Sequence, residues 1–270
     1  MNKNKILIAI FSCLTIAILA VSSFYLWKSY KKIEQAKHRR AAWLALEEKI
    51  NKQAKDFGQD TGVVIKDFTY GWKININQDK LFPSASMVKL PIMASCILAS
   101  SGGKLDLKKN LALKNKCRAL GSGRLKEYAS GTEFGIEDLI EIMIAESDNT
   151  AANMIIDYIG FEDLNNYFKK MGLNHTNIAR EMMDFKNRKN GRENYTTAKD
   201  LSLLLEKIYK NKLINKDYSR KCMVILKKQK IKDRIPRRLP AGIVVANKTG
   251  LEKGICHDAG IVFTPKGDFL

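Results

Sequence analysis

Three short motifs place the strongest constraint on how this chain can fold. In order they are Ser86-Met87-Val88-Lys89, Ser147-Asp148-Asn149 and Lys248-Thr249-Gly250, spread widely over 270 residues. A serine hydroxyl is a poor nucleophile at neutral pH, so it needs a base within hydrogen-bond reach, a route for its proton and a cationic group for an anionic substrate. The motifs supply serine hydroxyls and lysine amines without a histidine. If these groups act together, folding must gather segments that lie far apart in the sequence.

The context of the first motif favours a catalytic interpretation, although the pattern alone carries little weight. Ser29 to Lys32 and Ser101 to Lys104 show the same serine–lysine spacing. Only Ser86 opens a strongly amphipathic segment, which would place Lys89 one helical turn away, with Cβ atoms roughly 5–6 Å apart. Burial and a second cation such as Lys248 would lower the pKa of Lys89, so that it could accept the Ser86 proton. The alternative is a helix-capping serine beside a lysine that reaches solvent.

The second and third motifs each have a structural and a functional interpretation. Ser147 lies between two predicted helices, where Ser, Asp and Asn are common as helix caps. In the functional interpretation Ser147 relays a proton to the leaving nitrogen, Asn149 hydrogen-bonds the substrate, and Asp148 points inward and braces the turn. Lys248 would hold a substrate carboxylate, and Gly250 would bring the backbone close to the ligand. An ordinary strand end would explain the third motif equally simply.

Hydrophobic spacing predicts a helical middle region between two β-rich ends. Helices are predicted over residues 43–55, 86–100, 136–144, 152–159, 164–170 and 201–209. Strands are predicted at Thr61–Phe68 and Trp72–Asn77, which would form a hairpin, and at Gly242–Ala246 and Ala259–Thr264, with the third motif in the turn region between the last two. A polar stretch from Asn174 to Tyr195 is predicted to be a long loop. The expected fold class is α+β, with an antiparallel sheet built from both chain ends, an inserted all-helical subdomain, and the active site between them.

The amino-terminal segment predicts a membrane span. Residues Ile6 to Trp27 carry no charge and are numerous enough to cross a bilayer as a helix. We expect residues 1–27 to be a transmembrane anchor or signal segment, residues 28–40 a basic stalk, and residues 41–270 one catalytic domain. An uncleaved anchor is favoured because a cleaved signal usually has a shorter apolar run that ends in small residues. The basic residues of the stalk outnumber the lysines before the span, so the positive-inside rule alone would leave the domain in the cytoplasm.

Composition argues against nucleic-acid binding and against a metal centre. The formal net charge is +19, but the basic residues are scattered and have no aromatic residues between them, so solvated faces explain them better than a nucleic-acid partner. Cysteines outside the span follow no metal or redox spacing, and Cys96 falls in an apolar helical run typical of a buried free thiol. The histidines show no paired spacing, and His257 is expected in a late turn. We therefore expect no metal, no organic cofactor and no required disulfide.

Taken together, the three motifs resemble the signature of class A β-lactamases and penicillin-binding proteins. The resemblance covers roughly Ala41 to Leu270. Other segments that resemble the family lie near the motifs, namely Phe82-Pro83-Ser84-Ala85, Leu139-Ile140, Met143-Ile144, Asn153 and Leu239-Pro240-Ala241-Gly242. The resemblance implies a serine β-lactamase or D,D-peptidase-like fold, in agreement with the α+β class expected above.

The resemblance also implies roles in acyl transfer. Ser86 would form the acyl-enzyme, Lys89 would activate it, and Ser147 would protonate the β-lactam nitrogen. The backbone N–H groups of Ser86 and Leu251 would form the oxyanion hole, in which each donor is worth roughly 3–4 kcal/mol in comparable hydrolases. Because the donors belong to the backbone, Leu251 need not be polar.

Further residues are implied in substrate binding. By the resemblance, Asn149 would contact the substrate amide, while Lys248 and Thr249 would hold the substrate carboxylate. Gly250 would let the strand approach the ligand closely.

A first departure from the family pattern concerns deacylation. The family's β-lactamases carry a glutamate that positions water, in an Arg-x-Glu-x-x-Leu-Asn setting. The matching segment here is Arg180–Lys186, in which Met182 stands at the glutamate position. A thioether cannot act as a base, and Glu181 or Asp184 would substitute for it only under strict geometry. Without that base the acyl-enzyme could persist.

A second departure concerns the carboxyl end. The family normally adds another strand and a long helix, whereas this sequence stops at Phe269-Leu270. We therefore expect either a fragment or a domain without these elements. Their absence would expose apolar area worth roughly 25 cal/mol per Å².

These observations predict a β-lactamase-like serine hydrolase that opens β-lactam rings through a Ser86 acyl-enzyme. We expect a monomer at the cell membrane, with its catalytic domain on the extracytoplasmic side, or a secreted protein if the first segment is cleaved. One alternative is a penicillin-binding D,D-peptidase-like acyltransferase with slow deacylation, acting on peptidoglycan stem peptides and favoured by Met182. Another is a non-catalytic wall-binding scaffold. The expected partners are a small β-lactam or a stem peptide, together with the membrane, and no nucleic acid.

Overall fold

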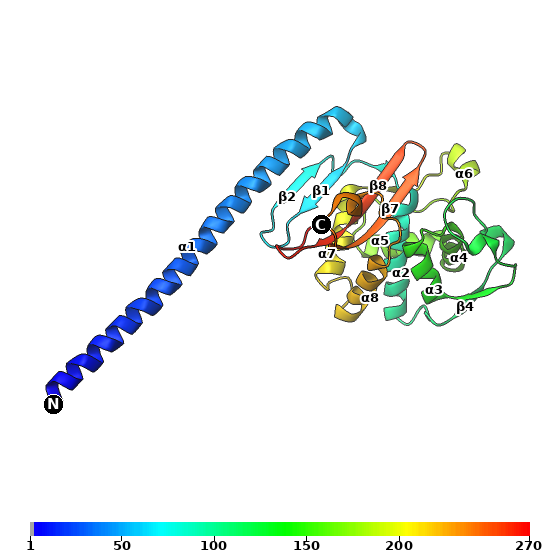
Figure 1. Cartoon of the computed structure of the whole chain (residues 1–270). Helices are drawn as coiled ribbons and strands as arrows, with labels where there is room; N and C mark the ends of the chain where they lie inside the picture. The colour runs from blue at the N-terminus through cyan, green and yellow to red at the C-terminus, as the bar shows by residue number, and fades with distance from the viewer. Residues whose placement is uncertain (1–2) are drawn as a thin grey trace. The chain divides into compact units, whose positions relative to one another are not determined.

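The computed structural model describes residues 3–270, and the chain divides into two compact units, Met1–Gly58 and Gln59–Leu270. Residues 1 and 2 of the predicted anchor segment lie outside the described residues. The described part of the first unit is a single long helix, α1 (Lys3–Phe57), which includes the helix predicted at residues 43–55 (Figure 1). Between Phe11 and Phe57 it contains an apolar stretch with a mean hydropathy of 1.5. By length and composition this stretch could span a bilayer, as an anchor or a signal segment would.

The second unit alternates short strands with helices. Its helices are α2 (Lys89–Ser101), α3 (Ile136–Ala145), α4 (Asn149–Ile159), α5 (Phe161–Lys170), α6 (Phe185–Lys189), α7 (Ala198–Tyr209) and α8 (Lys216–Lys227). Its strands are β1 (Val63–Lys66), β2 (Lys73–Ile76), β3 (Phe82–Pro83), β4 (Asn110–Ala112), β5 (Glu133–Gly135), β6 (Tyr195–Thr196), β7 (Val244–Glu252) and β8 (Ile255–Phe263). The predicted α+β class is confirmed (Figure 1).

Strands from the two ends of the second unit lie next to one another. β1 pairs with β2 and β7 pairs with β8, both antiparallel. Phe269 bridges the two pairs, because it faces Asp67 on one side and Val262 on the other. Leu270 adds backbone hydrogen bonds to Lys66 of 2.8 and 2.9 Å. The antiparallel sheet expected from both chain ends is therefore present, and the helical region lies between these ends in the sequence.

The core of the second unit is built around α2. Leu90, Ile92, Met93 and Ile97 of this helix are fully buried. α2 packs against α3, α5, α7 and α8. Because α2 begins at Lys89, the best-packed helix of the domain holds the lysine of the first motif. The preceding turn, Ala85–Val88, is a 3₁₀ turn, so the helix predicted to start at Ser86 starts three residues later as an α-helix.

The third motif lies inside a strand, and its predicted place in a turn is wrong. β7 runs through Lys248-Thr249-Gly250 to Glu252, and the connection to β8 is made by Lys253 and Gly254. The motif lacks the alternation of apolar residues by which strands are usually predicted. It can still form a strand because the hydrogen bonds of a β-sheet come from the backbone, and its residues pair in register with Ala259, Asp258 and His257. His257 accordingly lies on β8 and not in a late turn.

Other elements were not predicted at all. The long loop expected from Asn174 to Tyr195 contains the short helix α6, and α8 and the pair β4–β5 are additional. α8 carries several charges around a narrow apolar stripe in which Cys222, Ile225 and Leu226 are buried. Such a helix gains its stability from tertiary packing more than from its own propensity. The other predicted helices and the first hairpin are confirmed to within a few residues.

Candidate active site

The nucleophile candidate lies in a strained turn that touches the third motif. Ser86 is half-buried, and it follows Ala85, whose φ of +43° lies in a region that non-glycine residues rarely adopt. A Cβ atom added to Gly250 would lie 3.0 Å from Cγ of Met87 and 3.4 Å from its backbone nitrogen. The missing side chain of Gly250 therefore lets β7 lie directly against the Ser86 turn. Within residues 3–270 the Ser86 hydroxyl makes no hydrogen bond, so it is available to react.

The amine of Lys89 joins the first motif to the second. The side chain of Lys89 is completely buried. Its Nζ donates to the backbone oxygen of Ser147 and to Oδ1 of Asn149, each at 2.6 Å, and lies 3.4 Å from the Ser147 hydroxyl oxygen. The start of α2 therefore aims this amine at the segment between α3 and α4.

The amine of Lys248 joins the third motif to the same hydroxyl. Nζ of Lys248 lies 2.9 Å from Oγ of Ser147 and donates to the backbone oxygen of Thr249 at 2.6 Å. Ser147 is buried and has a φ of +57°, so its turn projects the hydroxyl between the two amines. Folding thus brings Lys89, Ser147 and Lys248 together, and we call these three residues the two-lysine cluster.

Burial shifts both amines of the two-lysine cluster toward their neutral forms. Burial lowers the pKa of Lys89 well below its usual value, the nearby charge of Lys248 lowers it further, and Asp148 opposes the shift. Burial also lowers the pKa of Lys248 to about 7, with Asp258 opposing and Arg234 adding to the effect. In the described part of the chain neither amine forms an ion pair with a carboxylate. These shifts favour the neutral form of Lys89, which carries a lone pair that can accept a proton.

The turn that carries Ser147 is held by a buried carboxylate. Asp148 accepts hydrogen bonds of 2.9 Å from the backbone nitrogens of Ala151 and Leu125, so its predicted inward orientation is confirmed. A Cβ atom at Gly123 would lie 2.2 Å from this carboxylate, so only glycine fits there. Asn149 is fixed next to it, because its Nδ2 donates to the Leu120 oxygen at 2.8 Å.

The remaining predicted binding residues lie along β7. Thr249 is buried beside Lys248, while the side chain of Leu251 is 67% exposed. The backbone of Leu251 follows Gly250, which is in contact distance of the Ser86 turn. Leu251 therefore follows the residue that lies against the turn, and its own side chain is exposed.

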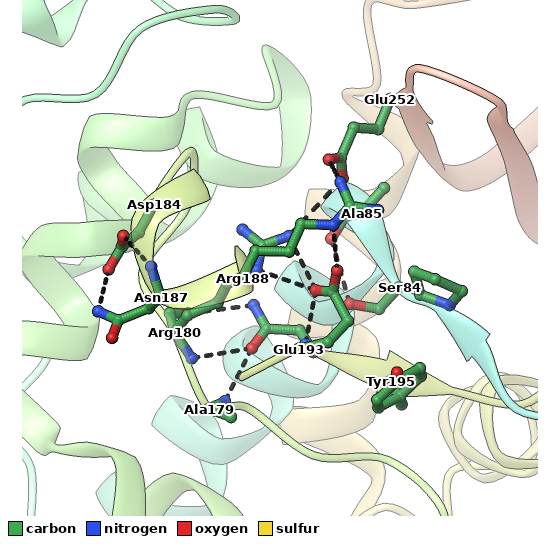
Figure 2. Close-up of polar contacts among 12 residues, drawn as sticks. Ser84, Ala85, Ala179, Arg180, Asp184, Asn187, Arg188, Glu193, Tyr195 and Glu252 are labelled. Carbon is green, nitrogen blue, oxygen red and sulfur yellow. Dashed lines mark hydrogen bonds and ion pairs between the residues drawn. The ribbon is translucent and has the colours of Figure 1, made fainter. Parts of the chain in front are cut away.

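Met182 occupies the loop position at which a deacylating glutamate would lie. Met182 is buried, and Asn153 holds its backbone by accepting from the Met182 nitrogen at 2.8 Å and donating to its oxygen at 3.3 Å. Asp184 caps α6 by accepting from the Asn187 nitrogen at 3.0 Å (Figure 2). Burial raises the pKa of Glu181, and the charges of Asp157 and Asp184 add to that shift. Neither acidic side chain hydrogen-bonds the two-lysine cluster.

Arg234 acts electrostatically on the two-lysine cluster, and the sequence analysis did not single it out. Its charge lowers the pKa of Lys248, and its Nε donates to Sγ of Cys256 at 3.2 Å. Nη1 lies 3.1 Å from a carboxylate oxygen of Asp233 but is buried without a hydrogen-bond partner. In the sequence Arg234 is one member of a basic run, and nothing in that run distinguishes it from its exposed neighbours.

Across residues 3–270, no group of three or more His, Cys, Asp and Glu side chains could hold an ion. His257 instead contacts the Pro83 backbone oxygen through Nε2 at 2.9 Å, and burial lowers the pKa of this imidazole.

Comparison with known proteins matches residues 45–270 to the family described as Beta-lactamase2, beta-lactamase enzyme family. The chain is similar to Beta-lactamase VEB-1 of Pseudomonas aeruginosa, with 26% identity over 237 residues that cover 82% of this chain and 79% of that protein. Among solved structures it is similar to a β-lactamase from Sphaerobacter thermophilus, with a TM-score of 0.72 and 31% identity over 77% of this chain and 79% of the other. It is also similar to a mutant of PBP-A, solved as an acyl-enzyme complex with penicillin G, with a TM-score of 0.76 and 29% identity over 84% of each chain.

The buried amine of Lys248 predicts a pH-dependent effect of Lys248→Met on stability. In the folded protein the pKa is about 7, against 10.5 for an ordinary lysine. Below pH 7 Lys248 is protonated in both the folded and the unfolded chain, so folding must bury a charged ammonium group. At such a pH the Lys248→Met variant should be more stable than the wild type by on the order of 1–2 kcal/mol. Between pH 7 and 10.5 only the unfolded chain holds the proton, so the free energy of unfolding of the wild type should rise relative to that of the variant.

Denaturant unfolding at pH 6, 7.5 and 9 measures this difference. Lys199→Met is the matched control, because Lys199 pairs with Asp79 at an exposed site and should show no comparable change between these pH values. The lowered pKa of Lys248 would be contradicted if Lys248→Met is less stable than the wild type at pH 6, or if the difference in stability between the two proteins does not change with pH.

Proposed function

Because this chain belongs to the beta-lactamase enzyme family, we propose that it is a serine hydrolase that opens β-lactam rings through an acyl-enzyme on Ser86. The observation that carries the proposal is the two-lysine cluster, in which the Ser147 hydroxyl lies between the amines of Lys89 and Lys248. These groups come from three separate segments of the chain and are buried together. Such an arrangement supplies a base and a proton route for a nucleophilic serine without a histidine.

In the proposed acylation, Oγ of Ser86 attacks the β-lactam carbonyl carbon while its proton passes to the neutral amine of Lys89. The negative charge that develops on the carbonyl oxygen is stabilised by the backbone N–H groups of Ser86 and Leu251. The carbon–nitrogen bond of the ring then breaks. Ser147 protonates the leaving nitrogen and regains a proton from Lys89, 3.4 Å away, so no net proton is consumed. The product is an ester between Ser86 and the opened ring.

The substrate carboxylate is proposed to bind beside the third motif. Lys248 and Thr249 supply a buried amine and a hydroxyl there, and Gly250 keeps the strand close to the reacting serine. Nη1 of Arg234, which is buried without a hydrogen-bond partner and lies 3.1 Å from Asp233, adds a second positively charged donor. Asn149 is proposed to contact the substrate amide.

The proposed enzyme forms its acyl-enzyme more readily than it hydrolyses it. Deacylation requires an activated water, and the buried thioether of Met182 cannot activate one. This favours a second candidate function, a penicillin-binding D,D-peptidase-like acyltransferase acting on peptidoglycan stem peptides. The similarity to PBP-A supports keeping this second function. Sustained turnover of a chromogenic β-lactam would favour the first function, and a stoichiometric adduct without turnover would favour the second.

The first experiment is a brief penicillin pulse followed by intact-mass analysis and peptide mapping. We expect one adduct per chain, on the peptide that contains Ser86, and none in Ser86→Ala. Ser101→Ala is a matched control, because Ser101 and Lys104 have the same spacing as Ser86 and Lys89 but lie at the end of α2. An adduct on another residue, or no adduct in a protein that also fails to turn over the β-lactam, would overturn the acyl-enzyme, and the second result would favour a non-catalytic scaffold.

The loop position predicts a gain of function in Met182→Glu. A carboxylate at this position can act as a general base, and such groups typically contribute about 10²–10⁴-fold to a rate. We expect the adduct of Met182→Glu to disappear at least about 10-fold faster than that of the wild type during a chase without penicillin. Met182→Gln has the same shape but no base, so its adduct should last as long as the wild-type adduct. Equal lifetimes in the Glu and Gln variants would refute this role of the position.

We propose that residues 1–27 anchor the protein in the cell membrane, that residues 28–40 form a stalk, and that residues 41–270 act on the extracytoplasmic side as a monomer. The apolar part of α1 supports membrane association. Peptidoglycan and antibiotics meet an enzyme outside the membrane, which is the reason to set aside the charge bias of the stalk.

A native cysteine reports on this topology. Cys256 is exposed, whereas Cys96, Cys117 and Cys222 are buried. A membrane-impermeant maleimide should therefore label Cys256 in intact cells, and Cys256→Ser should remove that label. Labelling that requires cell lysis would place the domain in the cytoplasm.

A further inference from the structure

We propose that helix α1 carries a binding site for the headgroups of anionic phospholipids, formed by Lys28, Lys31 and Lys32. We call these three residues the juxtamembrane lysines. They lie where the apolar part of α1 ends and the basic stalk begins. The inference rests on the proposed membrane anchor, and it is independent of the chemistry proposed at Ser86.

Aromatic side chains mark the depth at which α1 would leave the bilayer. The uncharged run of the sequence ends at Trp27, and Phe24, Tyr25 and Tyr30 lie within one helical turn of that residue. All four side chains are exposed, by 56% to 63%. The ring of Phe24 lies 6.0 and 6.4 Å from those of Tyr25 and Trp27, measured between ring centroids. Because aromatic residues concentrate at the headgroup level of membranes, these rings are expected to hold residues 24–30 at the membrane surface.

The juxtamembrane lysines follow these rings on one face of the same helix. Lys28, Lys31 and Lys32 are all exposed, and they have the spacing i, i+3 and i+4 within α1. Residues with this spacing are neighbours on an α-helix, with Cβ atoms about 5–6 Å apart. With a rise of about 1.5 Å per residue, Lys32 lies about 7–8 Å beyond Trp27 along the helix. This distance does not exceed the Debye length of about 8 Å at physiological ionic strength, so the charge of the membrane surface acts on all three lysines.

The protein itself does not neutralise this group of charges. Within residues 3–270, Lys28 and Lys32 form no ion pair, and Lys31 forms one, with Glu34 at 3.4 Å. The two side chains of that pair are 52% and 40% exposed, and exposed pairs contribute little. Like charges at neighbouring helix positions repel one another. A surface that carries several negative charges would relieve this repulsion, and the headgroup layer is such a surface next to a membrane-spanning helix.

The position of the lysines beside the anchor indicates that their partner is a lipid. In an anchored chain they stay at the bilayer surface, where headgroups are present at a high effective concentration. Lysine side chains suit this position, because the apolar stem can lie along the acyl chains while the ammonium group reaches the phosphates. Each lysine near an anionic surface favours association by about 5-fold. Phospholipids with a net negative charge should therefore be bound in preference to zwitterionic ones.

A second group of lysines on the same helix provides an internal comparison. Lys49, Lys52 and Lys55 are also exposed and belong to α1. They lie roughly 33–42 Å beyond Trp27 along the helix, which is several Debye lengths. These lysines carry the same charge as the juxtamembrane lysines but are too far from the aromatic residues to contact the headgroups.

The test measures which phospholipids stay bound to the full-length protein. The protein is reconstituted in vesicles of equal parts phosphatidylglycerol and phosphatidylcholine with the same acyl chains, so that the two lipids differ only in the headgroup. It is then transferred to a mild detergent and analysed by native mass spectrometry. The two lipids differ in mass, and the spectrum therefore gives the ratio of phosphatidylglycerol to phosphatidylcholine adducts. The same spectrum shows whether residues 1–27 are still present.

We expect the wild type to bind phosphatidylglycerol in excess by at least about 5-fold. Combining Lys28→Gln, Lys31→Gln and Lys32→Gln should bring the ratio close to one, because glutamine keeps a polar side chain of similar length and removes the charge. Sodium chloride at high concentration during reconstitution should lower the wild-type ratio, because salt screens exposed charges.

The matched control combines Lys49→Gln, Lys52→Gln and Lys55→Gln. It removes the same charge from the same helix at a distance from the headgroups, so it should leave the lipid ratio at the wild-type value. Both triple variants should react at Ser86 with a fluorescent penicillin as the wild type does, since neither changes a residue of the active site.

Equal binding of the two lipids by the wild type would overturn the inference, and so would an equal loss of phosphatidylglycerol in both triple variants. A chain that stays outside the vesicles, or that loses residues 1–27 in the cell, would overturn the proposed anchor together with the inference. The proposed chemistry is judged separately by the penicillin reaction. Reaction at Ser86 without lipid preference leaves the proposed function standing, and lipid preference without that reaction leaves the lipid site standing.

Discussion

The burial of two lysine amines around one serine hydroxyl is the interaction on which the rest of this domain depends. An ammonium group without a carboxylate partner is costly to bury, and this cost lowers the pKa of both lysines, while hydrogen bonds to Ser147, Asn149 and Thr249 satisfy the buried amines. The same shift favours the form of Lys89 that has a lone pair. Burial of the amines therefore both destabilises the fold and makes Lys89 a better proton acceptor. The closely packed helix α2 holds the amine of Lys89 in place.

The backbone around the two-lysine cluster adopts strained conformations that hold the side chains of the cluster in place. Ala85 and Ser147 both have positive φ values, each within or directly beside a motif. Such conformations persist only where the surroundings determine them strongly. The contact of Gly250 with Met87 and the buried carboxylate of Asp148 provide those surroundings. Helix α2, the segment between α3 and α4, and strand β7 thus fix the serine hydroxyls and the lysine amines relative to one another.

The loop after Arg180 differs from the pattern expected for a β-lactamase. It presents a buried thioether where a base would activate water, and it is joined to β7 by charged side chains. The hydrogen bonds of Lys89 and Lys248 go to Ser147, Asn149 and Thr249, which lie outside this loop. Under the proposed function, the loop therefore affects the lifetime of the acyl-enzyme and not the acylating groups.

The motifs, the α+β class and most of the helices could be predicted from the sequence, because each depends on residue type and on hydrophobic periodicity over short distances. Lys89, Ser147 and Lys248 could be named as partners for the same reason. Three features became visible only in the folded chain: the third motif lies within β7, Arg234 acts on Lys248, and Glu252 pairs with Arg188 of the loop. These features arise from backbone pairing and from charged residues that lie far apart in the sequence and meet in the fold. Burial sets how strongly such charges interact, and it exists only in the folded chain.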